Sequence, residues 1–367
     1  MIGIVGAGQL GRMLALAGYP LGLEFLFLDK DARSPGGQVA PILAGELTDR
    51  GLLGQLSERC EVLTFDWENI PVEALENLPG QARIAPPLRA LGCAQDRLSE
   101  KRTFELLGIP TTRYAAVDSR ASLEAAVRSI GLPGVLKTRR LGYDGKGQFV
   151  LRTPADLDAA WAALGPASLL YENLVPFQAE VSVIAVRGRD GKTAFYPLNL
   201  NVHREGILRL TRAPYGNVAL TRQAQRAAKK LLEHFDYVGV FTIEFFVSRG
   251  KLIANEMAPR VHNSGHWTIE GADTSQFENH VRAIAGLPLG STRARGHAAM
   301  INLIGELPDR DPLLREPGVH WHDYGKPARP GRKLGHLTLV ENSAQARNSR
   351  ALKVLKAVDR ATWLAVR

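Results

Sequence analysis

Apolar runs of strand length alternate with helical stretches over the first 95 residues of the chain. Strands are predicted at residues 2–5, 24–29 and 61–65, and a helix follows the first strand as far as Ala17. Strands that alternate with helices are typical of βαβ units, whose strands form a parallel sheet. The pattern therefore predicts an α/β domain at the N-terminus.

After a helical connector at residues 96–107, this alternation gives way to short strands joined by turns. A small α+β unit is predicted from three strands and one helix, at residues 134–137, 149–151, 169–175 and 153–163. An antiparallel region follows, with strands at 180–186, 193–197, 241–247 and 252–257 and helices at 223–234 and 274–284. From about residue 298, Pro and Gly interrupt short strands ahead of a final helix near 343–358.

Two isolated carboxylates stand in the apolar strand pair at residues 241–257. Glu244 and Glu256 lie on either side of a turn at 248–251, so a hairpin would place both on one face within reach of one cation. An ionised carboxylate on an apolar strand needs a compensating charge. Oxygen ligands suit Mg²⁺, which also takes phosphate oxygens of nucleotides. The alternative is a hairpin whose acids form structural ion pairs.

Groups that bind anions are concentrated in two segments downstream of this hairpin. Residues 260–266 read Arg-Val-His-Asn-Ser-Gly-His. Residues 324–333 carry four cations among Pro and Gly residues: Lys326, Arg329, Arg332 and Lys333. A backbone restrained in this way would preorganise the charges for one phosphate monoester, although basic clusters also occur on solvated surfaces. With the acid pair, these segments indicate chemistry on a phosphate.

The first predicted turn matches a dinucleotide-binding fingerprint through Gly6, Gly8 and Gly11, with Asp29 at the end of the second strand. In this interpretation Asp29 binds a ribose hydroxyl and the chain is a nicotinamide-dependent dehydrogenase. In the alternative, the loop amides bind another phosphate or a polar ligand. Nothing later in the chain supplies a hydride-transfer site, so the fingerprint is weak evidence for NAD.

A second glycine-rich loop, at residues 141–148, lies between two short predicted strands. It lacks Gly-Lys-Ser/Thr and opens no helix, so it is not a Walker loop; a flap over phosphates and a plain surface hairpin are the alternatives. Lys137 precedes it and can reach a phosphate as a point charge. Glu172 and Glu180 are candidates for adenine and ribose contacts, although ordinary surface acids have the same spacing.

Composition narrows the class of protein. The 367 residues carry a formal net charge of +9 and are 45% hydrophobic, which indicates two or three globular domains. Basic and acidic residues are interleaved, which favours a small anionic substrate over nucleic acid. Cys60 and Cys93 are isolated, so neither a disulfide framework nor a zinc site is indicated. No signal peptide or membrane-length apolar run is recognised, and we expect a cytoplasmic protein that does not bind membranes.

Six segments, which together span nearly the whole chain, carry a family resemblance: Gly8–Met13, Thr64–Asn69, Gly142–Gln148, Asn255–Arg260, His262–His266 and Gly331–His336. In this order they resemble the ATP-grasp superfamily, and within it the ligases that carboxylate 5-aminoimidazole ribonucleotide in purine biosynthesis. Two departures are small. The usual Phe-Glu-Phe-Glu-Asn reads Phe-Asp-Trp-Glu-Asn at 65–69, and Leu141 stands where a glycine often precedes the Tyr-Asp-Gly loop.

The resemblance implies a reaction in which ATP, bicarbonate and 5-aminoimidazole ribonucleotide give the N-carboxylated ribonucleotide, ADP and phosphate. Bicarbonate attacks the γ-phosphate to form carboxyphosphate, and the exocyclic amine captures the carboxyl group directly or as released CO₂. A sister ligase that activates formate for glycinamide ribonucleotide is the nearest alternative. Residues 65–69 and His336 favour the carboxylating enzymes.

The resemblance also implies roles for individual residues. Two Mg²⁺ ions, or Mn²⁺ in their place, would bind Glu244 and Glu256. Contacts to ATP are implied for Arg97, Lys137, Gly142, Tyr143, Gly145, Gly147, Gln148, Glu172, Val175, Glu180, His203 and Asn255. Catalytic groups would be Arg260, His262, Asn263, Asp144 and Lys146. The ribonucleotide pocket would contain Gln9, Leu10, Glu68, Tyr143, Asp144, Lys146, Lys326, Arg332 and Lys333.

An ATP-grasp fold in four parts is therefore expected. A Rossmann-like (pre-ATP-grasp) substrate domain would span residues 1–95, and a connector with a lid would span 96–175. A central antiparallel domain with the metal site would follow at 176–297, and a small β-rich region would close the chain at 298–367. The resemblance implies a homodimer, and neither His266 nor His336 is assigned a role as a base.

Overall fold

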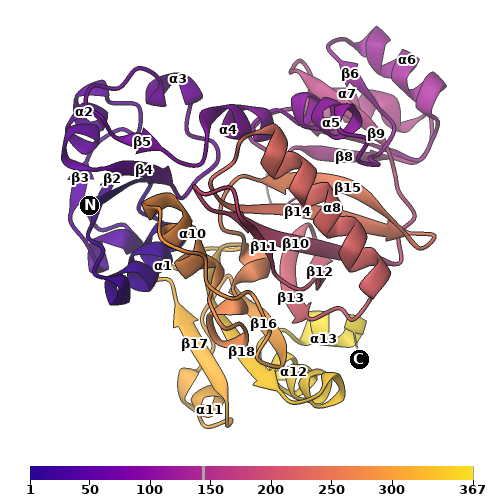
Figure 1. Cartoon of the computed structure of the whole chain (residues 1–367). Coiled ribbons are helices and arrows are strands. Elements are labelled where there is room, and N and C mark those ends of the chain that lie inside the picture. The colour runs from indigo at the N-terminus through magenta and orange to yellow at the C-terminus, as the bar shows by residue number, and fades with distance from the viewer. Residues whose placement is uncertain (143–144, 367) are drawn as a thin grey trace.

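The computed structural model describes residues 1–142 and 145–366, and its strands form three sheets. The N-terminal region lies at the left of Figure 1, the lid at the upper right, and the C-terminal elements at the bottom. The expected combination of α/β and α+β architecture is confirmed.

Five parallel strands form the N-terminal sheet, in the order β3-β2-β1-β4-β5. They are β1 (Ile2–Val5), β2 (Phe25–Asp29), β3 (Ile42–Ala44), β4 (Val62–Phe65) and β5 (Arg83–Ile84). The parallel sheet predicted from the βαβ pattern is confirmed. The outer strands β3 and β5 escape prediction because runs of two or three residues show no periodicity.

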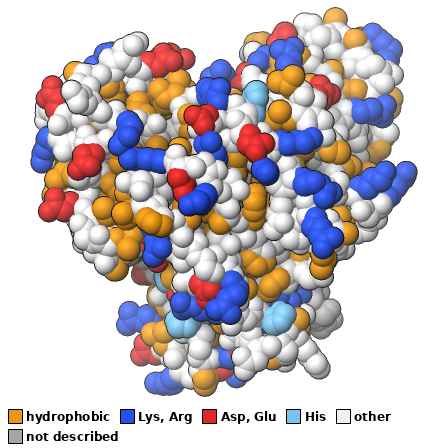
Figure 2. Space-filling model, in the orientation of Figure 1, with side chains coloured by type: hydrophobic (Ala, Val, Ile, Leu, Met, Phe, Trp, Pro, Cys, Tyr) orange, Lys and Arg blue, Asp and Glu red, His pale blue; other side chains and the backbone are white. Residues whose placement is uncertain are grey.

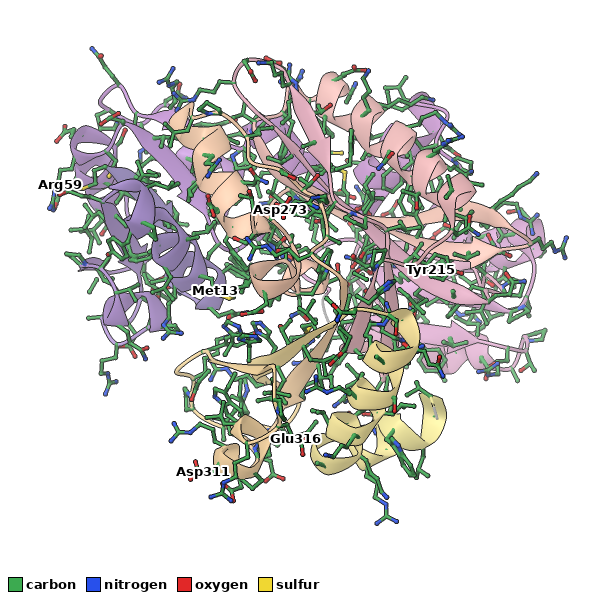
Figure 3. The ribbon with its side chains drawn as sticks, turned by 60° about the horizontal axis from the view of Figure 1, so that its bottom comes forward. Met13, Arg59, Tyr215, Asp273, Asp311 and Glu316 are labelled. Atoms are coloured by element: carbon green, nitrogen blue, oxygen red, sulfur yellow. The ribbon has the colours of Figure 1, made fainter. Side chains whose placement is uncertain are left out.

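Helices cover both faces of this sheet, as a parallel sheet requires. The helical elements of the region are α1 (Gln9–Gly18), η1 (Tyr19–Leu21), η2 (Pro35–Gln38), α2 (Arg50–Arg59), α3 (Val72–Leu75) and α4 (Leu88–Ala94). Met13 on α1 belongs to a buried cluster with Val281 of α10 (Gln276–Ala285) and Ile184 of the central sheet. In Figure 3, Met13 points toward the middle of the molecule, whereas Arg59 lies on the outer rim. An apolar core thus joins the N-terminal and central sheets.

The lid is a four-stranded antiparallel sheet in the order β6-β9-β7-β8. The connector and lid contain α5 (Arg97–Leu106), β6 (Tyr114–Val117), α6 (Arg120–Ile130), β7 (Gly134–Thr138), β8 (Gln148–Leu151), α7 (Asp156–Leu164) and β9 (Leu169–Asn173). Apolar residues of α6 and α7 form a small core against the strands. The second glycine-rich loop connects β7 to β8, as predicted.

The central sheet has nine antiparallel strands, in the order β15-β14-β10-β12-β13-β16-β18-β17 with β11 beside β10. They are β10 (Ala179–Arg187), β11 (Thr193–Phe195), β12 (Asn199–Arg204), β13 (Ile207–Ala213), β14 (Gly239–Ser248), β15 (Lys251–Ala258), β16 (His297–Ile304), β17 (Val319–Asp323) and β18 (Lys333–Glu341). Because β13 pairs with β16, this sheet runs through residue 298 into the C-terminal region.

Helices pack on both sides of the central sheet and complete the chain. Besides α10 they are α8 (Val218–His234), η3 (Asn263–Gly265), α9 (Thr268–Gly271), α11 (Arg310–Leu314), α12 (Ala344–Val358) and α13 (Arg360–Val366). The core against α8 is one cluster, and α12 closes another over β16 and β18. Among the described helices, we find none with both the length and the apolar character needed to cross a bilayer.

The hairpin of β12 and β13 was not expected from the sequence. Its strands bury Asn199, Asn201 and Thr211, which interrupt the apolar alternation that marks a strand. These polar side chains are hydrogen-bonded to one another, to β10 or to η3, which is how a core accepts them.

Candidate functional site

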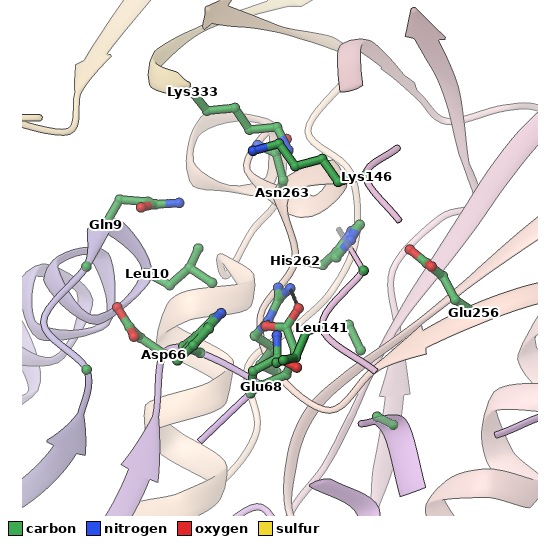
Figure 4. Close-up of a pocket in the computed structure, with 18 of the residues that line it drawn as sticks. Gln9, Leu10, Asp66, Glu68, Leu141, Lys146, Glu256, His262, Asn263 and Lys333 are labelled. Carbon is green, nitrogen blue, oxygen red and sulfur yellow. Dashed lines mark hydrogen bonds and ion pairs between the residues drawn. The ribbon is translucent and has the colours of Figure 1, made fainter. Parts of the chain in front are cut away.

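A cavity of about 740 Å³ lies where the N-terminal sheet, the lid loop and the central sheet meet (Figure 4). The space-filling surface is notched between the N-terminal region and the lid, and basic and acidic side chains are interspersed on this face (Figure 2). Fourteen residues with predicted roles line the cavity: Gln9, Leu10, Glu68, Arg97, Gly142, Lys146, Glu244, Glu256, Arg260, His262, Asn263, Lys326, Arg332 and Lys333.

The two hairpin acids face each other across neighbouring strands. Glu244 on β14 is the register partner of Glu256 on β15, and a bulge follows Glu244. Burial raises the pKa of Glu244 to about 7, and the charge of Glu256 adds to that rise. Burial also opposes ionisation of Glu256, but Arg97, whose Nη1 lies 3.2 Å from Oε2, outweighs it and lowers the pKa of Glu256.

This acid pair fits a divalent cation. Like charges opposite each other destabilise a strand pair unless something neutralises them. Within residues 1–142 and 145–366, no cluster of three or more His, Cys, Asp or Glu side chains offers a complete cage for a metal ion. Two carboxylates that leave most of the coordination shell open suit Mg²⁺, which keeps waters and takes phosphate oxygens.

Arg260 joins the central sheet to the N-terminal region across the cavity. Its Nε lies 2.5 Å from Glu68 Oε2 and its Nη2 lies 2.7 Å from Glu68 Oε1, a bidentate pair. Burial opposes ionisation of Glu68, but Arg260 outweighs it and lowers the pKa of Glu68. Glu68 of the N-terminal region therefore fixes the orientation of the Arg260 guanidinium.

His262 and Asn263 follow at the beginning of η3. The imidazole Nε2 of His262 lies 3.5 Å from Glu244 Oε1. Burial, with a contribution from Arg260, lowers the pKa of His262 well below its ordinary value. Asn263 exchanges two hydrogen bonds with Asn302 on β16, Nδ2 to Oδ1 at 3.0 Å and the reverse at 2.7 Å. Both side chains are thus oriented by the core beneath them.

The basic segment at residues 326–333 brings four cations to one wall of the cavity. Lys326, Arg329, Arg332 and Lys333 all line the cavity. Burial, and then the charge of Arg332, lower the pKa of Lys326 to about 8. A bound dianion stabilises the charged form of a lysine that neighbouring cations destabilise. This wall is therefore suited to bind a phosphate.

The second glycine-rich loop reaches from the lid to the central sheet. Gly145 and Gly147 have φ of 76° and 70°, and a Cβ on Gly145 would lie 3.1 Å from the carbonyl oxygen of Glu205. Leu141 has φ of 61°, the left-handed conformation that explains a glycine at this position in the family. Tyr143 and Asp144, both assigned roles from the sequence, lie outside the described residues.

Nine predicted residues do not line this cavity: Lys137, Gly145, Gly147, Gln148, Glu172, Val175, Glu180, His203 and Asn255. Four of them form two pairs, one within the lid sheet and one within the central sheet. Lys137 Nζ lies 2.9 Å from Glu172 Oε1, and His203 Nδ1 lies 3.0 Å from Glu180 Oε2.

Lys101 is a residue that the sequence interpretation missed. Its fully buried ammonium lies 3.0 Å from Glu172 Oε2 and 2.8 Å from the carbonyl oxygen of Asn255. Burial opposes ionisation of Glu172, but Lys137 and Lys101 outweigh it and lower the pKa of Glu172 strongly. A lysine in a predicted helix resembles any surface lysine, so only the tertiary structure reveals it.

Asp66 was also missed as a site residue, although it lies in a quoted motif. Its carboxylate sits under the first glycine-rich loop, where Gly11 N lies 3.4 Å from Oδ2. Burial raises the pKa of Asp66 to about 6. Asp29 accepts a hydrogen bond from Ala7 N at 2.6 Å and another from Ser34 Oγ at 2.8 Å. The protein's own carboxylates thus accept hydrogen bonds from the loop amides that a dinucleotide phosphate would need, which disfavours the dehydrogenase interpretation.

Gly6→Ala is expected to lower the free energy of unfolding by about 3 kcal/mol. The new Cβ would lie 2.0 Å from Asp66 Oδ1, and Gly6 has φ of 92°. Overpacking costs about 1–3 kcal/mol, and a left-handed backbone costs about 1–2 kcal/mol. Urea unfolding measures the loss. Gly22→Ala is the control, since Gly22 has φ of 72° and, among the described residues other than its chain neighbours, no atom lies within 4 Å of its Cβ position. Equal losses in both variants would contradict the role of Asp66.

Family models match three consecutive parts of the chain. They describe a ribonucleotide synthetase preATP-grasp domain at residues 1–95, an ATP-grasp domain at 102–277 and a phosphoribosylaminoimidazole carboxylase C-terminal domain at 298–350. With a cavity between the glycine-rich lid loop and the central sheet, the fold is that of the ATP-grasp ligases.

Individual relatives narrow the class. The N5-carboxyaminoimidazole ribonucleotide synthase of Pseudomonas aeruginosa is 50% identical over 338 residues, which cover 92% of this chain and 94% of the relative. The crystal structure of N5-carboxyaminoimidazole ribonucleotide synthetase from Thermus thermophilus matches with a TM-score of 0.94 and 51% identity, covering 98% of this chain and 99% of that one. The chain belongs to the N5-carboxyaminoimidazole ribonucleotide synthase family, which confirms the resemblance seen in the sequence.

A more distant relative is known with its ligands. The N5-carboxyaminoimidazole synthase of Aspergillus clavatus, solved in complex with ADP and 5-aminoimidazole ribonucleotide, is 32% identical with a TM-score of 0.91, and the match covers 98% of each chain.

Proposed function

We propose that this protein carboxylates 5-aminoimidazole ribonucleotide with ATP and bicarbonate, giving N5-carboxyaminoimidazole ribonucleotide, ADP and phosphate in purine biosynthesis. Membership of the synthase family carries the proposal. The cavity supports it, because one continuous space is bounded by the acid pair and by the Lys326 wall. A nucleotide phosphate and a ribonucleotide phosphate would each find charged groups to bind them within this space.

ATP would bind between the lid and the central sheet. We assign its phosphates to Arg97, Lys137 and the loop residues Gly142, Gly145, Gly147 and Gln148. Its base and ribose would contact Glu172, Val175, Glu180, His203 and Asn255. Glu244 and Glu256 would hold two Mg²⁺ ions, or Mn²⁺, which offset phosphate charge during transfer.

Arg260, His262 and Asn263 would hold bicarbonate and carboxyphosphate. Fixed donors in a site that excludes water stabilise the charge that develops on such oxyanions. Here the hydrogen bonds of Arg260 to Glu68 and of Asn263 to Asn302 hold two of these donors in place. No covalent nucleophile on the protein is needed.

The ribonucleotide would place its 5′-phosphate on Lys326, Arg332 and Lys333. Gln9, Leu10 and Glu68 would line the rest of that pocket, and Tyr143, Asp144 and Lys146 would position the exocyclic amine. Since Lys326 and Glu256 both line this one cavity, the amine would reach carboxyphosphate without leaving the protein.

Release of ADP measured with and without bicarbonate and with and without 5-aminoimidazole ribonucleotide tests the function. We expect full turnover only when both are present, with formation of the N-carboxylated product. Turnover that depends on formate and glycinamide ribonucleotide would instead identify the sister ligase. Binding of NADH without binding of Mg-ATP would identify a dehydrogenase.

The Michaelis constant for 5-aminoimidazole ribonucleotide is expected to rise as the pH increases through about 8. Lys326 loses its proton in that range, since its pKa is lowered to about 8, and a neutral amine no longer attracts the phosphate dianion. Hydrogen bonds to charged groups contribute about 1.5–3 kcal/mol, so Lys326→Ala should raise this constant by about tenfold to a hundredfold. Initial rates at varied pH measure both effects.

Lys326→Arg is the control for this prediction, because arginine stays charged throughout the range. The variant should show no pH-dependent rise, and the constant for ATP should change little in any of the three proteins. Equal effects of Lys326→Ala on both substrates would show that the basic wall serves another ligand.

We also propose a homodimer in the cytoplasm. Family resemblance supports the dimer, and two free cysteines, Cys60 and Cys93, are compatible with a reducing compartment. Sedimentation at micromolar concentration tests the assembly state.

A further inference from the structure

The two ring nitrogens of His262 face different partners. Nδ1 lies 2.9 Å from Ser264 Oγ and 3.3 Å from the backbone nitrogen of Ser264, whose N–H it accepts. Nε2 lies 3.5 Å from Glu244 Oε1, and both residues line the cavity. A backbone N–H can only donate. The geometry therefore makes Nδ1 an acceptor and leaves the ring proton for Nε2.

The hydroxyl of Ser264 ends a buried hydrogen-bond chain that leads to the same result. Ser264 Oγ lies 2.7 Å from Ser182 Oγ on β10. Ser182 Oγ receives Nδ2 of Asn201 at 3.0 Å and Nδ2 of Asn199 at 3.4 Å. Because amide nitrogens only donate, the single proton of Ser182 goes to Ser264, and the proton of Ser264 goes to His262.

The amides that set this direction are themselves fixed. Trp267 Nε1, which only donates, lies 2.9 Å from Asn199 Oδ1, and the Ser264 carbonyl oxygen, which only accepts, lies 3.0 Å from Asn199 Nδ2. Thr211 Oγ1 donates to Asn201 Oδ1 at 3.0 Å. These side chains are all buried, and in this arrangement each of these donated protons has an acceptor, as a core requires.

We propose that Ser182 and Ser264 are positioning residues that hold His262 as the tautomer with its proton on Nε2. His262 then presents an N–H donor to an oxyanion in the cavity and is not a general base. This inference rests on the proposed function, in which the oxyanion is bicarbonate or carboxyphosphate. A donor fixed in advance beside Arg260 and Asn263 costs no reorientation when charge develops. A protonated Nε2 also has no lone pair with which to bind a metal ion.

Nitrogen-15 NMR of the ligand-free protein, labelled at histidine, tests the tautomer without turnover. The chain has nine histidines, and His262→Gln identifies the relevant signals by their loss. We expect a pyrrole-type Nε2 and a pyridine-type Nδ1 in the unaltered protein. The opposite assignment, or averaged shifts from exchanging tautomers, would overturn the proposal.

Ser264→Ala removes one of the two donors to Nδ1 and is expected to move both shifts toward averaged values. Ser248→Ala is the matched control, because Ser248 is another buried serine of the central sheet and its hydroxyl bonds to the Pro176 carbonyl oxygen at 2.7 Å. That variant should leave the His262 signals unchanged. If Ser264→Ala also leaves them unchanged, the serine chain does not set the tautomer.

Kinetics separate a donor from a base. A glutamine at position 262 keeps an N–H near the place of Nε2 but cannot accept a proton, whereas alanine keeps neither property. His262→Ala is expected to lower kcat for bicarbonate-dependent ADP release by about a hundredfold, the usual cost of one oxyanion donor. His262→Gln should recover about tenfold of that loss, with the Michaelis constant for ATP unchanged. Equal losses would contradict the donor role. Failure of the unaltered protein to carboxylate the ribonucleotide would refute the proposed function and leave the NMR result standing.

Discussion

Glu256→Gln is expected to lower ATP turnover by more than about a hundredfold while the chain remains folded. Replacing residues that only support a metal ligand already costs about 10–100-fold, and Glu256 would be a ligand itself. The substitution keeps the side-chain shape but removes the charge that faces Glu244 across the hairpin and that pairs with Arg97 at 3.2 Å. Phosphate release at saturating ATP and varied Mg²⁺ measures the loss.

Folding should survive this change, because neutralising one of two opposed carboxylates relieves repulsion in the metal-free protein. The pKa of Glu244 should fall, since the charge of Glu256 helps to raise it. Glu233→Gln is the matched control, because Glu233 is exposed on α8 and pairs with Lys229 at 3.7 Å. Near-normal phosphate release by Glu256→Gln at ordinary Mg²⁺ would remove the acid pair from the mechanism.

Arg260→Lys is expected to lower carboxylation by about a hundredfold to a thousandfold. Lysine keeps the positive charge but cannot form the bidentate pair that holds Arg260 against Glu68. The remaining ammonium would lack the fixed direction that makes an oxyanion donor effective, and the loss of one such donor costs about that factor. The ratio of product formed to ADP released should also fall, because a poorly held carboxyphosphate is open to water.

Arg282→Lys is the control for the exchange of arginine by lysine, since Arg282 pairs with Glu278 on the surface side of α10. It should leave both rate and coupling unchanged. Glu68→Gln should reproduce part of the Arg260→Lys defect, because it frees the same guanidinium. A normal product-to-ADP ratio in Arg260→Lys would mean that Arg260 does not hold the reactive intermediate.

Local sequence patterns predicted the secondary structure correctly where the hydrophobic periodicity was strong. The parallel strands predicted at 2–5 and 61–65 and the helix at Ala344–Val358 lie where the apolar spacing predicted them, but that helix is not the last one, because α13 follows it. The β12–β13 hairpin was missed because buried polar residues break its alternation. The fingerprint at Gly6, Gly8 and Gly11 also misleads when read alone, since Asp66, far away in sequence, accepts the hydrogen bond of the Gly11 amide.

In the candidate site, too, some residues could be found from the sequence and others could not. Glu244 and Glu256 could be paired from sequence because one short turn separates their strands, and strand geometry then fixes their faces. Lys101 and Asn302 could not be found in this way. Their importance comes from contacts with Glu172 and Asn263, which other elements bring to them.

The kinds of secondary structure and the groups able to bind phosphate and metal could be predicted from the sequence alone, because they follow from short-range spacing and residue chemistry. The superfamily came from the resemblance of six motifs to a known family. Which charges neutralise one another, and which way each buried donor points, became clear only from the packing of the folded chain. Glu68 meets Arg260 and Ser182 meets Ser264 only after distant strands pack together. Such contacts depend on the meeting of segments remote in the chain, which no local pattern encodes.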